Sequence, residues 1–160
     1  MNKLIQKQGL YIALAFMAYH AAARADDALM ATDAWVREAP PHAEVSAGYL
    51  TLHNHSAQAH KLVGVSSPQF QKAEIHEMKM ANGQARMQRV GELTIAPNSS
   101  VELKPGGYHL MLIKAVQPLK AGDTVEIKLQ FNDTPPVTVQ APVRKTDAEE
   151  QPHQHHDMNM

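Results

Sequence analysis

The chain has 160 residues, no cysteine, and a formal net charge of −1 with its ten histidines counted as neutral. This near balance of charges argues against nucleic-acid binding, because such proteins neutralise phosphates with an excess of lysine and arginine. The missing cysteines exclude disulfide bonds, thiolate metal sites and the ordinary blue-copper centre, which needs a cysteine sulfur.

Residues 1–25 have the pattern of a cleaved secretory signal peptide. Lys3 and Lys7 precede an apolar run from Leu10 to Tyr19, and Ala23-Arg24-Ala25 places small residues at the cleavage positions. A membrane anchor is the less favoured alternative, since it needs about 20 apolar residues. We therefore expect export to the periplasm, no stable membrane insertion after cleavage, and a mature chain whose formal charge falls from −1 to −4 as three cations leave.

Residues 26–143 have the pattern of one all-β domain. Period-two alternation, typical of a strand with one buried face, is clearest in 124–131, where Val125, Ile127, Leu129 and Phe131 are separated by polar residues. Nine other short segments bounded by turn-forming residues have similar patterns: 34–36, 46–53, 61–66, 73–80, 85–90, 92–95, 101–103, 108–113 and 137–143. Many short strands without helical periodicity predict an antiparallel β-sandwich or Greek-key barrel.

The Asn82-Gly83 dipeptide predicts a β-hairpin with a two-residue type I′ turn, in which both residues have positive φ. Counting outward from this turn pairs Ala81 with Gln84 and Met78 with Met87. The hairpin therefore fixes which side chains of the two strands lie opposite each other.

A histidine and three methionines share one face of this hairpin, because strand side chains alternate. His76, Met78 and Met80 lie on the same face as Met87, and His76 lies diagonally from Met87 at about 7–8 Å between Cα atoms. His76 and Met87 can therefore reach one ion. Met78 is a potential auxiliary ligand, and both Met78 and Met80 fit equally well as packing residues.

The segment 108–113 supplies a second histidine and methionine on one face. His109 and Met111 alternate with Tyr108, Leu110 and Leu112, which form the natural core set. We expect His109 and Met111 to point outward without a packing role.

Neutral thioethers together with imidazoles favour Cu(I) over harder ions. Zinc more often takes cysteine or carboxylate alongside histidine, and no carboxylate is among the candidates. Neither ligand type needs to lose a proton at neutral pH, so a site of this kind can load and unload with little charge change. His76, Met87, His109 and Met111 are therefore the candidate Cu(I) ligands, to be weighed against methionines that merely fill a core.

The spacing of these four residues resembles that of the PCu(A)C family of periplasmic copper chaperones, H(M)x10Mx21HxM. The segments 33–37, 47–52, 75–78 and 103–111 are also similar to that family, and the resemblance covers about 31–143. It implies a cupredoxin-like β-sandwich with a Cu(I) site on these four side chains. It also implies delivery of copper to cytochrome c oxidase, at the subunit that carries the CuA centre, alongside a Sco-type thiol protein.

Residues 144–160 differ in composition and predict a mobile tail without a core of its own. Five potential ligands fall within its last eight residues, and imidazole-rich tracts of this kind bind Cu(II): His153, His155, His156, Met158 and Met160. We expect this tail to capture Cu(II). An expression tag is the trivial alternative, although a mixed His/Met sequence differs from a uniform histidine run.

Four more histidines, His42, His53, His55 and His60, lie outside these groups. The resembling family commonly has small or hydroxyl residues where this chain has His53 and His55. A second surface metal patch is one interpretation, and exposed histidines at strand ends are the favoured one.

The motifs of hydrolases and phosphate-binding enzymes do not occur in the sequence, so we expect no enzymatic activity. The main alternative to a chaperone is a copper-buffering or resistance protein that sequesters copper, because the same ligands serve both purposes. Direct transfer of copper to an apo oxidase subunit, compared with passive release, separates the two hypotheses.

Overall fold

The computed structural model describes residues 28–145. This part of the chain contains ten strands and confirms each predicted strand segment: β1 (Leu29–Arg37), β2 (Val45–Asn54), β3 (His60–Ser66), β4 (Phe70–Ala81), β5 (Gln84–Val90), β6 (Leu93–Ile95), β7 (Ser99–Leu103), β8 (Tyr108–Ala115), β9 (Thr124–Phe131) and β10 (Val137–Arg144). Among the described residues, no helix is long and apolar enough to cross a membrane. The predicted signal peptide and the five predicted tail ligands lie outside the described residues.

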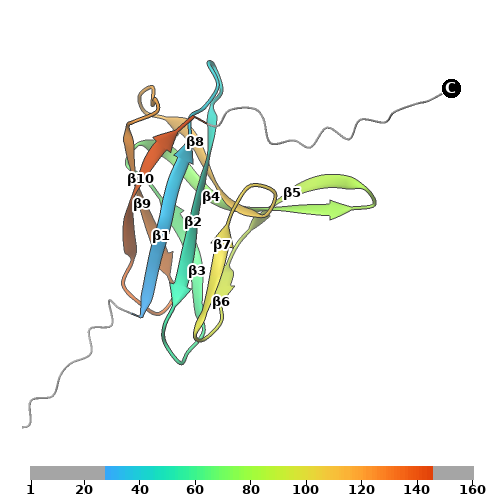
Figure 1. The fold of residues 1–160 in the computed structure, drawn as a ribbon, viewed down its shortest axis with the longest axis vertical. Helices are drawn as coiled ribbons and strands as arrows, with labels where there is room; N and C mark the ends of the chain where they lie inside the picture. Colours follow the sequence, from blue (N-terminus) through green and yellow to red (C-terminus); the bar gives the residue numbers. More distant parts are fainter. Residues whose placement is uncertain (1–27, 146–160) are drawn as a thin grey trace, which may run out of the picture.

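The strands form a two-layered sandwich (Figure 1). Their order is β5-β4-β8-β2-β1-β10-β9-β3-β6, with β7 pairing separately with β2. The two layers are joined by a short parallel pairing of β1 with β10. In this pairing Val36 lies beside Val143 and Arg37 lies beside Arg144. The sheet is therefore mixed rather than wholly antiparallel as predicted, because β1 and β10 come from opposite ends of the domain and alternation carries no information on strand direction.

The core lies between the two layers. On β9, Val125, Ile127 and Leu129 are fully buried, and on β8 Leu110 and Leu112 are fully buried as well. Each such side chain contributes about 1.5–3 kcal/mol by leaving water. Because these residues occupy the inner face of β8, the alternate positions of that strand lie on the outer face of the sheet.

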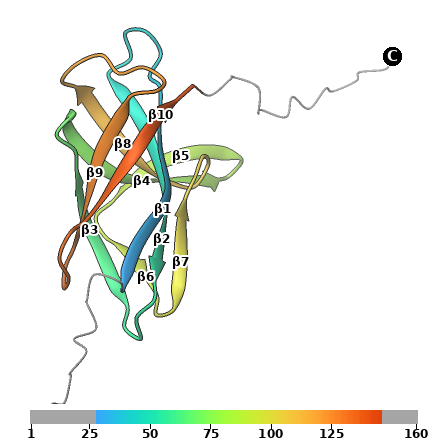
Figure 2. The same ribbon diagram turned by 60° about the vertical axis from the view of Figure 1, so that its left-hand side comes forward.

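The β4–β5 hairpin projects from the sandwich as an arm (Figures 1 and 2). The first part of β4, from Phe70 to Glu77, pairs with β8, whereas its last residues pair with β5 alone. Every residue of β5 except its last, Val90, is exposed. The arm therefore depends on its own turn and backbone ladder more than on burial in the core.

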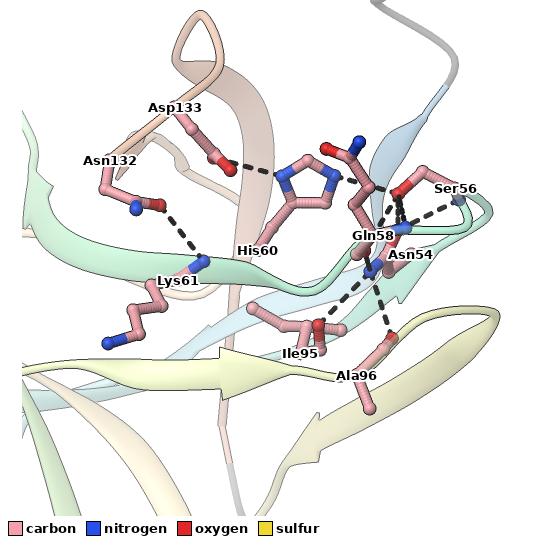
Figure 3. A network of polar contacts seen from close by, with 9 residues as sticks. All are labelled: Asn54, Ser56, Gln58, His60, Lys61, Ile95, Ala96, Asn132 and Asp133. Carbon is pink, nitrogen blue, oxygen red and sulfur yellow. Dashed lines mark hydrogen bonds and ion pairs between the residues drawn. The ribbon is translucent and has the colours of Figure 1, made fainter.

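A buried polar network closes the end of the sandwich where β2 meets β3 (Figure 3). The Asn54 side-chain amide donates to the carbonyl oxygens of Gln58, Ile95 and Ala96 at 2.7, 3.2 and 3.0 Å. Its Oδ1 accepts the backbone N–H of Ser56 at 2.9 Å. One buried side chain thus satisfies backbone groups from the β2–β3 turn and from the end of β6.

Candidate metal centre

The β4–β5 hairpin has the predicted register. Ala81 pairs with Gln84 and Met78 pairs with Met87. Asn82 has a φ of 53° and Gly83 a φ of 74°, as the type I′ turn requires. This register places Met78 and Met87 side by side on one face of the arm.

The two candidate imidazoles lie directly opposite each other on neighbouring strands. His76 of β4 pairs with His109 of β8, and the centroids of their rings are 6.1 Å apart with planes tilted by 40°. Met111 pairs with Glu74 in the next row of the same face. The fold thus joins two segments that are separated by more than twenty residues in the sequence.

His109 lies on the outer face of β8 as predicted, but it is only 7% exposed, so the expectation that it has no packing role is wrong. The reason is that β8 is an interior strand with β4 on one side and β2 on the other, so neighbouring side chains cover its outer face. The Nδ1–H of His109 donates to the carbonyl oxygen of Gly107 at 3.1 Å. This bond leaves the Nε2 lone pair of His109 free to bind a metal ion.

His76 is held by a carboxylate that the sequence did not suggest. Its Nε2 lies 2.9 Å from Oε2 of Glu74. A hydrogen bond from Lys72, the larger contribution, and a second one from His76 lower the pKa of Glu74 to about 2. This carboxylate is therefore ionised and accepts the Nε2–H of His76. The Nδ1 lone pair of His76 is buried and has no hydrogen-bond partner, an arrangement that is unfavourable unless an ion or ligand occupies it.

Glu74 positions His76 rather than adding a carboxylate ligand. Its Oε1 lies 2.7 Å from Lys72 Nζ and 3.5 Å from Arg89 Nε, while its Oε2 holds His76. The signal that could have revealed Glu74 is its place two residues before His76, on the same strand face. Among residues 28–145, no three histidine, aspartate or glutamate side chains gather into a group able to hold a metal ion. A metal here would be bound by imidazole and thioether donors.

The methionines extend from this histidine pair along the arm. Met111 and Met78 are half-buried, whereas Met87 is 50% exposed and Met80 is 72% exposed. Met87 lies one strand beyond β4, so the hairpin must bring it over the imidazoles if all four predicted ligands are to share an ion. Met78 is diagonally adjacent to His109 on the β4–β8 ladder, so it is an alternative to Met87 as a sulfur ligand of the metal ion.

The remaining histidines of the described chain differ in their surroundings, and the expectation of exposed histidines at strand ends is wrong for His60. His60 is 6% exposed, with Nδ1 3.0 Å from Asp133 Oδ1 and Nε2 2.9 Å from Ser56 Oγ (Figure 3). His42 lies in the β1–β2 loop, at the other end of the sandwich, where it lines a cavity of about 690 Å³. Only His53 and His55 are neighbours.

The connectivity of Ser56, His60 and Asp133 is that of a hydrolytic triad, but the Ser56 hydroxyl is already engaged. Its Oγ lies 2.8 Å from Asn54 Oδ1 and 2.9 Å from the carbonyl oxygen of Gln58, which both act as acceptors. This chain of bonds therefore stabilises the β2–β3 turn.

The all-β sandwich has the cupredoxin-like fold of a PCuAC domain. The family model "Putative lipoprotein LpqE-like" matches residues 29–143. The chain belongs to the LpqE-like family, which confirms the resemblance to PCuAC proteins.

Solved structures agree with this assignment. The chain is 35% identical to CuI-DR1885 from Deinococcus radiodurans, with a TM-score of 0.61 and coverage of 79% of this chain and 85% of the other. Against the apo PCuAC domain from PmoF1 the identity is 24%, the TM-score 0.64 and the coverage 74% and 95%, which supports the fold.

Curated relatives are more distant or match over a shorter span. "Putative lipoprotein Lxx21020" from Leifsonia xyli is 29% identical over 119 residues, which cover 74% of this chain and 70% of the relative. "Uncharacterized protein RP573" from Rickettsia prowazekii is 36% identical over 89 residues, which cover 55% and 49%.

Proposed function

We propose that this protein is a periplasmic copper chaperone that binds Cu(I) through His76, Met87, His109 and Met111 and passes it to an acceptor protein. The observation that carries the proposal is the pair of opposed imidazoles whose ring centroids are 6.1 Å apart and which each retain a nitrogen lone pair. The similarity to CuI-DR1885, a Cu(I)-bound protein, supports the same ion for this chain.

The ligand chemistry suits reversible Cu(I) binding. His76 would bind through Nδ1 and His109 through Nε2, because their other nitrogens are engaged by Glu74 and Gly107. Thioether sulfur is a soft ligand that matches Cu(I). Neither imidazole nor thioether needs to release a proton, so copper enters and leaves without a change in the protonation of its ligands.

The exposed arm provides a route for transfer. Because Met87 is half-exposed, an acceptor's ligands can replace its sulfur while the more buried imidazoles still hold the ion. From the family resemblance, we propose that the acceptor is the cytochrome c oxidase subunit that carries CuA, with a Sco-type thiol protein acting alongside. The periplasmic location rests on the signal-peptide pattern of residues 1–25.

An anaerobic competition titration of the mature chain against a Cu(I)-specific chelator tests the binding site. We expect one tight equivalent, and we expect Met87→Leu combined with Met111→Leu to abolish it, because leucine keeps the volume but removes the sulfur. Met80→Leu is the matched control and should retain tight binding. Retained affinity in the double variant would refute the site assignment.

The predicted Cu(II) binding by the tail is tested with a separate variant, measured in the same titrations. Replacement of His153, His155 and His156 by asparagine should remove Cu(II) uptake and leave the Cu(I) affinity unchanged. Loss of the tight Cu(I) equivalent in this variant would instead make the tail the principal site, in favour of metal scavenging.

A transfer experiment separates the chaperone from a copper-buffering or resistance protein. Cu(I)-loaded protein is mixed with an apo CuA domain, and the rate of copper appearance on the acceptor is followed. A chaperone transfers at a rate that increases with acceptor concentration, because the two proteins form a complex. A buffer transfers no faster than its unassisted release of Cu(I) to a chelator.

A further inference from the structure

A second cluster of imidazole and thioether side chains lies at the far end of β1 and β2. Met30 of β1 pairs directly with His53 of β2. His55 follows two residues later, and its backbone N–H donates to the carbonyl oxygen of Ala28 at 2.8 Å, which continues the alignment with β1. Since side chains on a strand alternate, these three residues share the outer face, where Met30 is 47% exposed.

The two rings of this cluster are separated by the same distance as the rings of the proposed Cu(I) site. The ring centroids of His53 and His55 are 6.0 Å apart with planes only 5° from parallel, compared with 6.1 Å for His76 and His109. Two imidazoles that each bind one ion through nitrogen at about 2 Å have ring centroids about 5–6 Å apart. The rings are therefore close enough to share one metal ion, but their near-parallel planes keep the in-plane nitrogen lone pairs from converging. The exposed ring of His55 must turn about its side-chain torsions to bind that ion.

The hydrogen bonds around His53 also fix which of its nitrogens carries the proton. The Thr32 hydroxyl donates to Asp33 Oδ2 at 2.9 Å, so Thr32 Oγ1 accepts the proton of His53 Nε2 at 2.9 Å. The lone pair of His53 Nδ1 then accepts the Ser100 hydroxyl at 2.7 Å. Ser100 is exposed, so its hydroxyl can turn to water when an ion binds Nδ1.

Ligand orientation and local charge both favour a cation at this cluster. The carboxylate, hydroxyl and imidazole of Asp33, Thr32 and His53 repeat the outer-shell arrangement that orients metal-binding histidines. The ring of His55 is exposed and makes no hydrogen bond to any residue of 28–145. The cluster therefore offers two imidazoles and one sulfur beside a negative charge.

We infer that Met30, His53 and His55 form a second copper-binding site. Its donors are of the same chemical class as those of the first site, so its ligand is a soft or borderline ion, with Cu(I) favoured by the sulfur of Met30. His53 lies six residues along β2 from Ala47, which pairs with Met111 of the first site, a separation of roughly 20 Å. The two sites cannot share an ion, and the protein can carry copper at both.

Nuclear magnetic resonance of the mature full-length chain tests this inference, with histidine ring nitrogens and methionine methyl groups observed as Cu(I) is added without oxygen. We expect a copper-dependent shift of the His53 and His55 ring signals together with the Met30 methyl signal. His53→Asn and His55→Asn should each abolish that event, and Met30→Leu should weaken it about tenfold.

The matched control is His42→Asn, which removes an exposed histidine at the other end of the sandwich. His42 has a φ of 67°, a conformation that asparagine tolerates well. This variant should leave both copper events unchanged. Backbone amide spectra of each variant verify that the fold is intact.

The two sites are judged independently because they are read from different residues. If the His76 and His109 signals respond to Cu(I) while those of His53, His55 and Met30 stay unchanged at excess copper, the second site does not exist. The opposite pattern would uphold the second site and refute the first.

Discussion

At the scale of single residues, the two imidazoles of the candidate copper site are held in place before any ion arrives. The Gly107 carbonyl selects the tautomer of His109, and the Glu74 carboxylate selects that of His76. Each imidazole therefore retains its lone pair on a defined nitrogen, and the two rings need little reorganisation when copper binds.

Replacing Glu74 by glutamine should weaken Cu(I) binding about 10- to 100-fold, because His76 loses the anionic partner that orients it. Competition titration with a Cu(I) chelator measures the change. Glu77→Gln is the control, since Glu77 lies on the opposite face of β4 and its low pKa comes chiefly from the hydrogen bond of Lys79. Equal affinities for the two variants would contradict the role of Glu74.

The sequence predicted part of this site. The period of two and the Asn82-Gly83 turn correctly paired Met78 with Met87 and placed His76 on their face. The burial of His109 and the contact between Glu74 and His76 were missed, because both depend on which strand lies next to β8 and on side-chain rotamers. Periodicity identifies a face of a strand but not the neighbours that cover it.

At the scale of elements, the β4–β5 arm combines a fixed register with weak burial. Its turn requires two consecutive residues with positive φ, of which only Gly83 lacks a Cβ. Because β5 is exposed along most of its length, the turn and the ladder determine where Met87 lies relative to the histidines.

Gly83→Val should weaken Cu(I) binding about tenfold by disturbing the pairing of Met78 with Met87, because valine at a φ of 74° is strained by about 1–2 kcal/mol. The melting temperature of the sandwich should change little, since the arm adds little to the core. Calorimetry and chelator competition on the same samples measure the two effects.

Gly122→Val is the control for that strain. Gly122 has a φ of 97°, and, as at Gly83, a new Cβ would meet no atom within 4 Å. It lies between β8 and β9, so this variant should lower the melting temperature by a few degrees and keep the Cu(I) affinity. A Gly83→Val protein with unchanged affinity would mean that the turn does not position Met87.

The positions of the strands followed from the sequence more completely than their pairing. Every predicted segment is a strand because alternation and turn residues are local signals. The parallel contact of β1 with β10 and the insertion of β8 between β4 and β2 are non-local. They depend on how two layers close around one core, which short patterns do not encode.

At the scale of the whole molecule, the sandwich holds two imidazole and thioether clusters apart on one outer face. The first lies on β4, β5 and β8, and the second lies at the end of β1 and β2. The network around Asn54 and His60 connects that end of β2 to β3, β6 and the β9–β10 loop (Figure 3). Loss of this hydrogen-bond network should therefore destabilise the fold and the second cluster, and it should leave the first cluster unchanged.

Asn54→Ala should lower the free energy of unfolding by about 2–4 kcal/mol, because the carbonyl oxygens of Gln58, Ile95 and Ala96 lose the buried donor that they share. Urea denaturation of the metal-free protein measures this loss. Asn132→Ala is the matched control, since Asn132 Oδ1 accepts a single exposed bond from Lys61 N at 3.3 Å and its removal should cost less than about 0.5 kcal/mol. In conditions where Asn54→Ala remains folded, tight Cu(I) binding at His76 and His109 should persist. Loss of that binding would mean that the two ends of the sandwich are coupled, in contradiction to the independence of the two sites.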